Sequence, residues 1–165
     1  MRTSISRRGN PDKSDSDFSG PQTSSGSACA ETGHIHVHET GSVEACGHKV
    51  LAMPGQEGKI TAKQVNKAYE SHWTDGAREH MVQPKLVYIS HPTELGTLYT
   101  KQELMDLRNV CDACGLYLFL DGARLAYGLA ADGTDVTLHD LAVLTDAFYI
   151  GGHQGRGTFW RMCGH

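Results

Sequence analysis

Hydrophobic and polar positions along the chain predict strands that alternate with helices. Uninterrupted apolar runs occur at 116–120 (LYLFL) and 147–150 (AFYI), and the segments 85–90 (KLVYIS) and 48–53 (HKVLAM) each contain an apolar run beside polar residues. Short apolar runs bounded by turn residues are typical of strands that are buried on both faces. We therefore expect a sheet that is covered on both sides.

Helix signals lie between these runs. Two Thr-x-x-Gln/Glu capping boxes, at 61–64 and 100–103, each open a predicted helix. The first helix extends to about residue 69, and the second carries an apolar face up to Gly115. A third, short helix is expected over 138–144. This alternation predicts an α/β fold with a mainly parallel sheet and helices on both faces.

The carboxyl ends of parallel strands are where such folds bind ligands. Asp121 ends the run LYLFL, and Arg124 follows three residues later. A carboxylate there can accept a proton from a buried ring nitrogen, and a guanidinium can bind a substrate carboxylate. The residue types alone equally allow Asp121 to cap the next helix while Arg124 extends outward. The loop after KLVYIS, with the sequence SHPTELG, lies at the same predicted edge.

Composition divides the chain into three parts. Residues 1–30 are rich in Ser, Gly, Asp and Arg and contain one aromatic residue, Phe18, so they are expected to be disordered. Residues 31–152 form the predicted domain, and residues 153–165 form a separate tail. A net charge of −4 argues against nucleic-acid binding. No apolar run is long enough for a membrane span, which favours a cytoplasmic protein.

Histidine and cysteine patterns raise two metal hypotheses. The stretch TGHIHVHETG places three histidines at alternate positions, which would share one side of a strand, about 6 to 7 Å apart. The alternative is that they are half-exposed side chains at the opening of a helix. A metal-binding module would use His34, His36, His38, Cys46 and His48. The CDAC motif at 111–114 falls on the apolar face of a predicted helix, which favours core thiols over a redox or zinc site.

Four segments in order, from about Thr32 to Gly152, resemble the low-specificity threonine aldolases. They are TGHIHVHETGSVEACGHKVLAMPGQEGKIT, MVQPKLVYISHPTELGTLYTKQEL, GLYLFLDGARLAYGL and LTDAFYIGG. These enzymes belong to the aromatic amino acid β-eliminating lyases, pyridoxal 5′-phosphate (PLP) enzymes of fold type I. The resemblance implies the central part of the large domain, without the small C-terminal domain. It also implies homo-oligomers that cleave L-threonine or L-allo-threonine to glycine and acetaldehyde.

Site residues carry over from the resemblance one by one. The histidine that stacks on the PLP ring falls on His34, whereas the position of His36 is usually Asn, so no zinc site is implied. The aspartate that pairs with the ring nitrogen falls on Asp121, and the arginine that binds the substrate carboxylate falls on Arg124. His91 replaces the Asn that the family has in the SHPTELG loop.

The lysine that forms an imine with PLP is absent. The family reads Gly-Gly-Thr-Lys after this strand, whereas the chain reads Gly151-Gly152-His153-Gln154, and no lysine follows Lys101. Read one base later, the codons possible for His153 and Gln154 include those for Thr-Lys. The codons that follow permit the family's continuation, which suggests a frameshift.

The phosphate-binding turn is also altered, since Pro21 replaces the second Gly and the Thr of a Gly-Gly-Thr segment. We therefore expect PLP to bind this chain poorly and expect little or no lyase turnover. Two alternatives remain. One is a non-catalytic fragment that pairs with an intact aldolase protomer, and the other is the metal-binding module.

Overall fold

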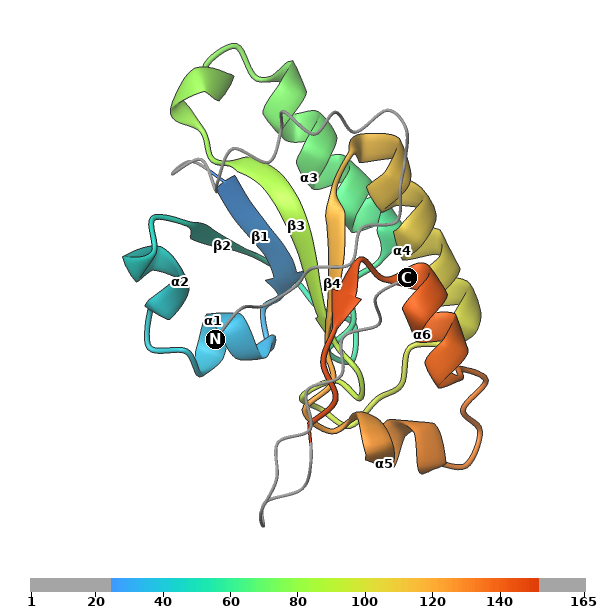
Figure 1. Ribbon diagram of the computed structural model, residues 1–165. Helices are drawn as coiled ribbons and strands as arrows, with labels where there is room; N and C mark the ends of the chain where they lie inside the picture. The colour runs from blue at the N-terminus through green and yellow to red at the C-terminus, as the bar shows by residue number, and fades with distance from the viewer. Residues whose placement is uncertain (1–24, 152–165) are drawn as a thin grey trace.

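The computed structural model describes residues 25–151, which form a five-stranded sheet in which every pairing is parallel. The strand order β2-β1-β3-β4-β5 requires crossover connections, which the helices provide (Figure 1). The α/β class and the parallel sheet are confirmed. The strands are β1 (Ser25–Ala30), β2 (Lys49–Met53), β3 (Gln83–Ser90), β4 (Tyr117–Asp121) and β5 (Ala147–Phe148).

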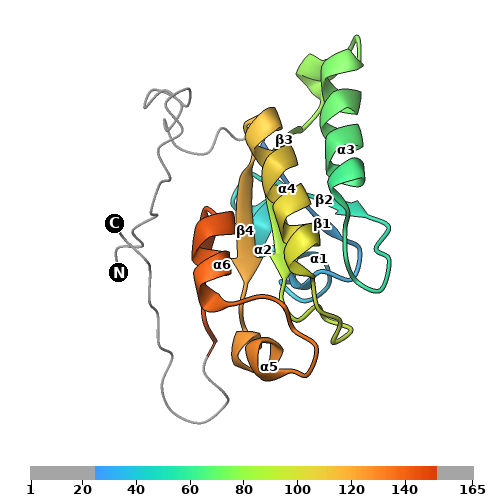
Figure 2. The same cartoon turned by 90° about the vertical axis from the view of Figure 1, so that its right-hand side faces the viewer.

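Helices lie on both faces of the sheet, but unevenly. Figure 2 shows the three longest, α3, α4 and α6, in front of one face, with α1 and α2 behind the other. The short helix α5 lies beyond the carboxyl ends of β3 and β4 (Figure 1). Their bounds are α1 (His34–Val37), α2 (Ser42–Ala45), α3 (Ala62–Thr74), α4 (Lys101–Cys114), α5 (Leu125–Ala130) and α6 (Leu138–Leu144), with a 3₁₀ turn η2 (Arg78–His80).

The predicted capping boxes are present. The side chains of Thr61 and Thr100 accept the backbone N–H groups of Gln64 and Glu103. The side chains of Gln64 and Glu103 in turn accept the backbone N–H groups of the two threonines, so α3 and α4 begin as expected. Helix α3 runs to Thr74, further than predicted. Gly115 ends α4 with φ 65°, the left-handed conformation that suits glycine. The strand predicted over 147–150 is shorter, with residues 147 and 148 alone in the ladder.

The expectation that residues 1–30 are disordered is wrong for residues 25–30. They form β1, between β2 and β3 in the sheet, and Cys29 is fully buried. The strand consists of Ser, Gly, Ala and Cys, and hydrogen bonding to two neighbouring strands stabilises it despite its small side chains. A Cβ on Gly26 would lie 2.7 Å from Leu51 Cδ1, so a larger residue there would have to displace the side chain of Leu51. Residues 1–24 and 152–165 lie outside the described part.

Cys111 and Cys114 are free thiols on α4, and Cys111 is completely buried in the core. Burial raises the pKa of the Cys111 thiol to about 12, so it stays protonated at neutral pH. The prediction that the CDAC motif supplies core thiols is confirmed. Between residues 25 and 151, no helix has the length and apolar character that crossing a bilayer requires.

Candidate functional site

Asp121 lies at the carboxyl end of β4, almost completely buried, with 7% of its surface exposed. Its Oδ1 accepts the backbone N–H of Ala123 at 2.9 Å and the hydroxyl of Tyr149, and its Oδ2 accepts the hydroxyl of Tyr88. Helix α5 begins after Arg124 without a side-chain cap, so Asp121 does not cap it. The carboxylate instead stabilises the turn that follows β4.

Both tyrosines that bind Asp121 keep their protons. Burial is the largest cause that raises the pKa of Tyr88 and of Tyr149 well above the ordinary tyrosine value. The hydrogen bond to Asp121 and the charge of Asp121 raise both pKa values further. The charges of Glu94 and Glu39 raise the pKa of Tyr149 further. The contacts of Glu94 with Arg124 and of Tyr149 with Asp121 bring the segments that follow β3 and β5 to the end of β4.

Alkaline titration tests this arrangement. In the folded chain, Tyr88, Tyr99 and Tyr149 are expected to ionise far above the ordinary value of about 10. Their stabilising contribution is complete below the pKa of the unfolded chain and is lost as pH rises toward the folded pKa, so alkali should unfold the protein. Tyrosinate absorbance against pH measures this.

The variant Asp121→Asn should lower the pH at which Tyr88 and Tyr149 ionise, because it removes the carboxylate charge that both hydroxyls face. Tyr99 serves as the internal control, because burial, with smaller effects from Glu103 and Cys29, causes its shift. If Asp121→Asn gives the same tyrosine titration curve as the unsubstituted chain, the contacts at Asp121 are contradicted.

Arg124 forms an ion pair with Glu94 in the loop that follows β3. Ser90 at the end of β3 donates its hydroxyl to the other oxygen of Glu94 at 2.9 Å, so the carboxylate is held between two partners. The side chain of Arg124 is 46% exposed, which leaves guanidinium N–H groups accessible to a ligand. The alternative in which Arg124 only extends outward does not describe this contact, because the ion pair with Glu94 holds Arg124 at the strand ends.

His34 opens α1 directly after β1, and its Nδ1 lies 2.9 Å from Oε1 of Glu39. His34 and His36 therefore lie in helix α1 and His38 is its C-cap, so the strand hypothesis is wrong. His48 bonds Ser25 at the opposite end of β1, 2.8 Å between Oγ and Nδ1. A six-residue strand is about 17 to 20 Å long, so His34 and His48 cannot share an ion. Within residues 25–151, no three His, Cys, Asp or Glu side chains lie close enough together to hold a metal ion.

His91 follows β3 and is fully buried, so it does not face a ligand at the sheet edge. Its backbone N–H donates to the carbonyl of Asp121 at 3.0 Å, and its Nδ1 accepts the backbone N–H of Tyr99 at 3.3 Å. Burial lowers the pKa of His91, which keeps the ring neutral. The backbone of His91 therefore joins the start of the SHPTELG loop to β4, and its ring joins the loop to Tyr99.

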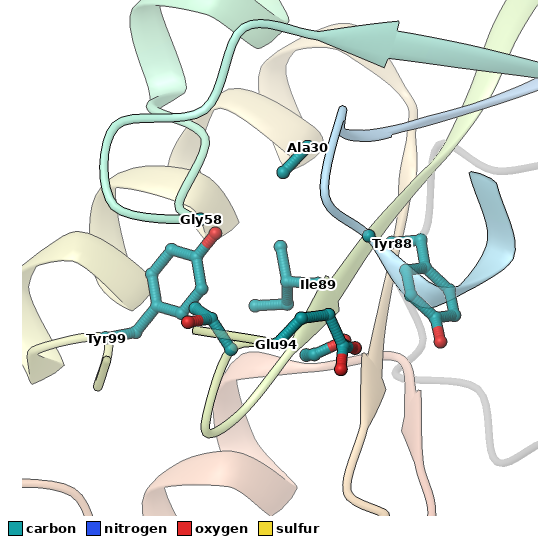
Figure 3. Close-up of a pocket in the computed structure, with 9 residues that line it drawn as sticks. Ala30, Gly58, Tyr88, Ile89, Glu94 and Tyr99 are labelled. Atoms are coloured by element: carbon teal, nitrogen blue, oxygen red, sulfur yellow. The ribbon is translucent and has the colours of Figure 1, made fainter. Parts of the chain in front are cut away.

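A small cavity of about 10 Å³ lies beside this edge (Figure 3). It is no larger than one water molecule, so the cavity itself cannot hold a cofactor. Figure 3 shows Tyr88 and Ile89 on opposite sides of β3, with Glu94 below them. The cavity is lined by Ala30, Gly33, Gly58, Tyr88, Ile89, Ser90, Thr93, Glu94 and Tyr99.

Sequence reasoning missed Tyr88 and Tyr149, and it placed the loop that contains Glu94 at this edge without identifying its contact with Arg124. Tyr88 lies two positions before the end of β3, and therefore on the same face as the strand's last residue. This alternation was the available signal for Tyr88. The positions expected for the imine-forming lysine, His153 and Gln154, lie outside the described residues.

Comparison with known proteins identifies the family. Residues 21–158 match the family model described as beta-eliminating lyase. A low specificity L-threonine aldolase of Pseudomonas aeruginosa is 31% identical over 108 residues, which cover 62% of this chain and 29% of that protein. A threonine aldolase structure from Leishmania major is 50% identical with a TM-score of 0.73, covering 79% of this chain and 37% of that one.

More distant structures share the fold alone. A putative L-allo-threonine aldolase from Listeria monocytogenes is 21% identical with a TM-score of 0.53, over 76% of this chain and 32% of that one. The chain spans less than a third of the length of its curated relatives. The match covers most of the chain, from β1 through β5, and includes the turn at Asp121. The chain therefore belongs to the beta-eliminating lyase family, whose cofactor is PLP.

Proposed function

We propose that residues 25–151 form one half of a threonine-aldolase active site, the half that faces the PLP ring nitrogen and the substrate carboxylate. The observation that carries the proposal is the buried carboxylate of Asp121 at the end of β4, with Arg124 beside it on an accessible surface. A threonine aldolase 50% identical to this chain supports the substrate class, L-threonine or L-allo-threonine.

The residues present fit PLP at two points. Each carboxylate oxygen has two lone pairs, and the described residues supply three donors to Asp121, so one acceptor position on Oδ2 remains for a ring N–H. Arg124 can bind the substrate carboxylate with the N–H groups that Glu94 does not use. His34, ordered after β1, would lie against the ring. The cofactor, when bound, supplies an electron sink for the breaking Cα–Cβ bond.

A third requirement is not met, because the chain has no lysine after β5, where the resemblance places the residue that holds the cofactor covalently. Lys101 is the last lysine of the chain, and its Nζ lies 2.7 Å from Asp140 at the start of α6. Lys59 pairs with Glu103 at 2.7 Å. The ammonium groups of Lys59 and Lys101 are therefore both paired with carboxylates. We therefore propose that the 165-residue chain binds PLP weakly and has no lyase turnover.

Turnover of L-threonine and L-allo-threonine by the 165-residue chain tests this proposal. With added PLP, acetaldehyde should form at least about 10³-fold more slowly than with the Pseudomonas aeruginosa relative, because loss of a covalent catalytic residue has effects of this order. Turnover comparable to that of the relative would contradict inactivity. Failure of the chain to bind PLP at any concentration would contradict the cofactor site.

The frameshift is a separate proposal that concerns the gene. Sequencing genomic DNA and transcript across the codons for Gly151 to His165 tests it directly. Loss of one base that restores Thr-Lys would show that the gene product carries the lysine that forms the imine with PLP. If both nucleic acids match the present sequence, the gene encodes a chain without the lysine.

A second candidate function is pairing with an intact aldolase protomer. On one face of the sheet the helices among residues 25–151 are the short α1 and α2, and this face carries apolar side chains that are half-buried, namely Leu86, Tyr117 and Phe119. Partly covered apolar surface is typical of protein interfaces. Co-purification with a full-length homologue supports this function, and a chain that stays alone when the two are co-expressed contradicts it.

A further inference from the structure

Two tyrosine hydroxyls from different strand ends meet at one carboxylate. Ser90 and Asp121 are register partners of β3 and β4, so Tyr88, two residues before Ser90, lies on the same face of the sheet as Asp121. Tyr149 follows β5 on the other side of β4 and donates to Oδ1, whereas Tyr88 donates to Oδ2. The carboxylate is therefore held from both sides.

The two phenol rings are fixed by packing. Phe119 lies two residues before Asp121, and therefore on the same face of β4. Its ring stacks on Tyr88 at 5.7 Å between centroids and lies 6.3 Å from the ring of Tyr149. Contacts of this kind hold aromatic rings in defined orientations. The backbone adds a further restraint, because the N–H of Gly151 donates to the carbonyl of Gly122 at 2.8 Å.

The hydrogen bonds decide where the free acceptor position of Asp121 points. Oδ1 uses both of its lone pairs, on Ala123 N–H and on Tyr149. Oδ2 uses one, on Tyr88, which leaves one among the described contacts. Without either hydroxyl the carboxylate could rotate about its χ2 torsion, which is broad for aspartate. The acceptor position would then have no fixed direction.

We propose that Tyr88 and Tyr149 are positioning residues, a clamp that aims the remaining lone pair of Asp121 Oδ2 at the ring nitrogen of PLP. This inference rests on the proposed cofactor site and adds the two groups that orient its carboxylate. The tyrosines act through Asp121 and do not touch the reacting atoms. Their effect should therefore depend on whether the ligand has a ring nitrogen.

Two ligands separate positioning from general packing. Binding of PLP and of its deaza analogue, in which C–H replaces the ring nitrogen, is measured by quenching of tryptophan fluorescence in the 165-residue chain. The unsubstituted chain should prefer PLP about 10-fold or more, the size of a charge-assisted hydrogen bond. Tyr88→Phe and Tyr149→Phe should each reduce that preference to about 2- to 3-fold, with no change in affinity for the analogue.

Tyr69→Phe is the matched control, because Tyr69 lies on α3, outside the strand ends, and its ring packs near Trp73. It should keep the full preference. If the unsubstituted chain binds both ligands equally or neither, the proposed cofactor site is wrong and the clamp with it. If it prefers PLP and both clamp variants retain that preference, or lose affinity for both ligands equally, the cofactor site remains and the clamp is wrong. Circular dichroism verifies that each variant is folded.

Discussion

Replacing Asp146 with alanine is expected to lower the free energy of unfolding by about 3 to 5 kcal/mol, the usual result of breaking a buried ion pair. Asp146 lies just before β5, and its Oδ2 lies 2.7 Å from Nη1 of Arg108 on α4. The same oxygen accepts the backbone N–H of Leu118 at 2.7 Å. Arg108 is only 6% exposed, so the substitution leaves a buried charge and a buried N–H without this acceptor.

Urea unfolding followed by circular dichroism measures the loss. Asp112→Ala is the matched control, because Asp112 also contacts Arg108, at 2.8 Å, but its side chain is 52% exposed. An exposed pair contributes about 1 kcal/mol or less. The double variant Arg108→Met, Asp146→Leu should recover most of the stability, because it removes both charges together. Equal losses for Asp146→Ala and Asp112→Ala would contradict the role of Asp146.

Sequence reasoning predicted the elements whose signals are local. A capping box depends on two residue types three positions apart, so the starts of α3 and α4 could be identified without knowing the fold. Strand β1 could not, because its small residues have no β-propensity pattern and its stability comes from strands on both sides. Its interior position, between β2 and β3, is a property of the tertiary structure.

The candidate site shows the same division. Asp121 and Arg124 were predicted because the end of an apolar strand is visible in the sequence. The partners of these residues were not, because the contact between Tyr88 and Asp121 depends on the register of β3 against β4. The ion pair between Glu94 and Arg124 joins two loops 30 residues apart. Such contacts follow from the order of strands, which the sequence pattern left open.

Gly122→Ala is expected to lower the free energy of unfolding by about 3 kcal/mol, at the upper end of overpacking effects. Gly122 does not have a positive φ, so the backbone conformation itself allows alanine. The obstacle is space, because an added Cβ would lie 1.9 Å from the carbonyl oxygen of Tyr149, which is a backbone atom. The turn after β4 and the segment after β5 must separate to admit it. That separation would also break the bond from Gly151 N–H to the carbonyl of Gly122.

Because Tyr149 belongs to the displaced segment, the same variant should release its hydroxyl from Asp121. Tyrosine titration should then show ionisation of Tyr149 at lower pH, while Tyr99, buried on the other side of the sheet, keeps its raised pKa. Gly76→Ala is the matched control, since a Cβ there meets nothing within 4 Å and its φ is not positive. If Gly122→Ala matches this control in stability and titration, the loops are not in contact. If stability falls and the titration of Tyr149 does not change, the strain is relieved elsewhere and the carboxylate remains held from both sides.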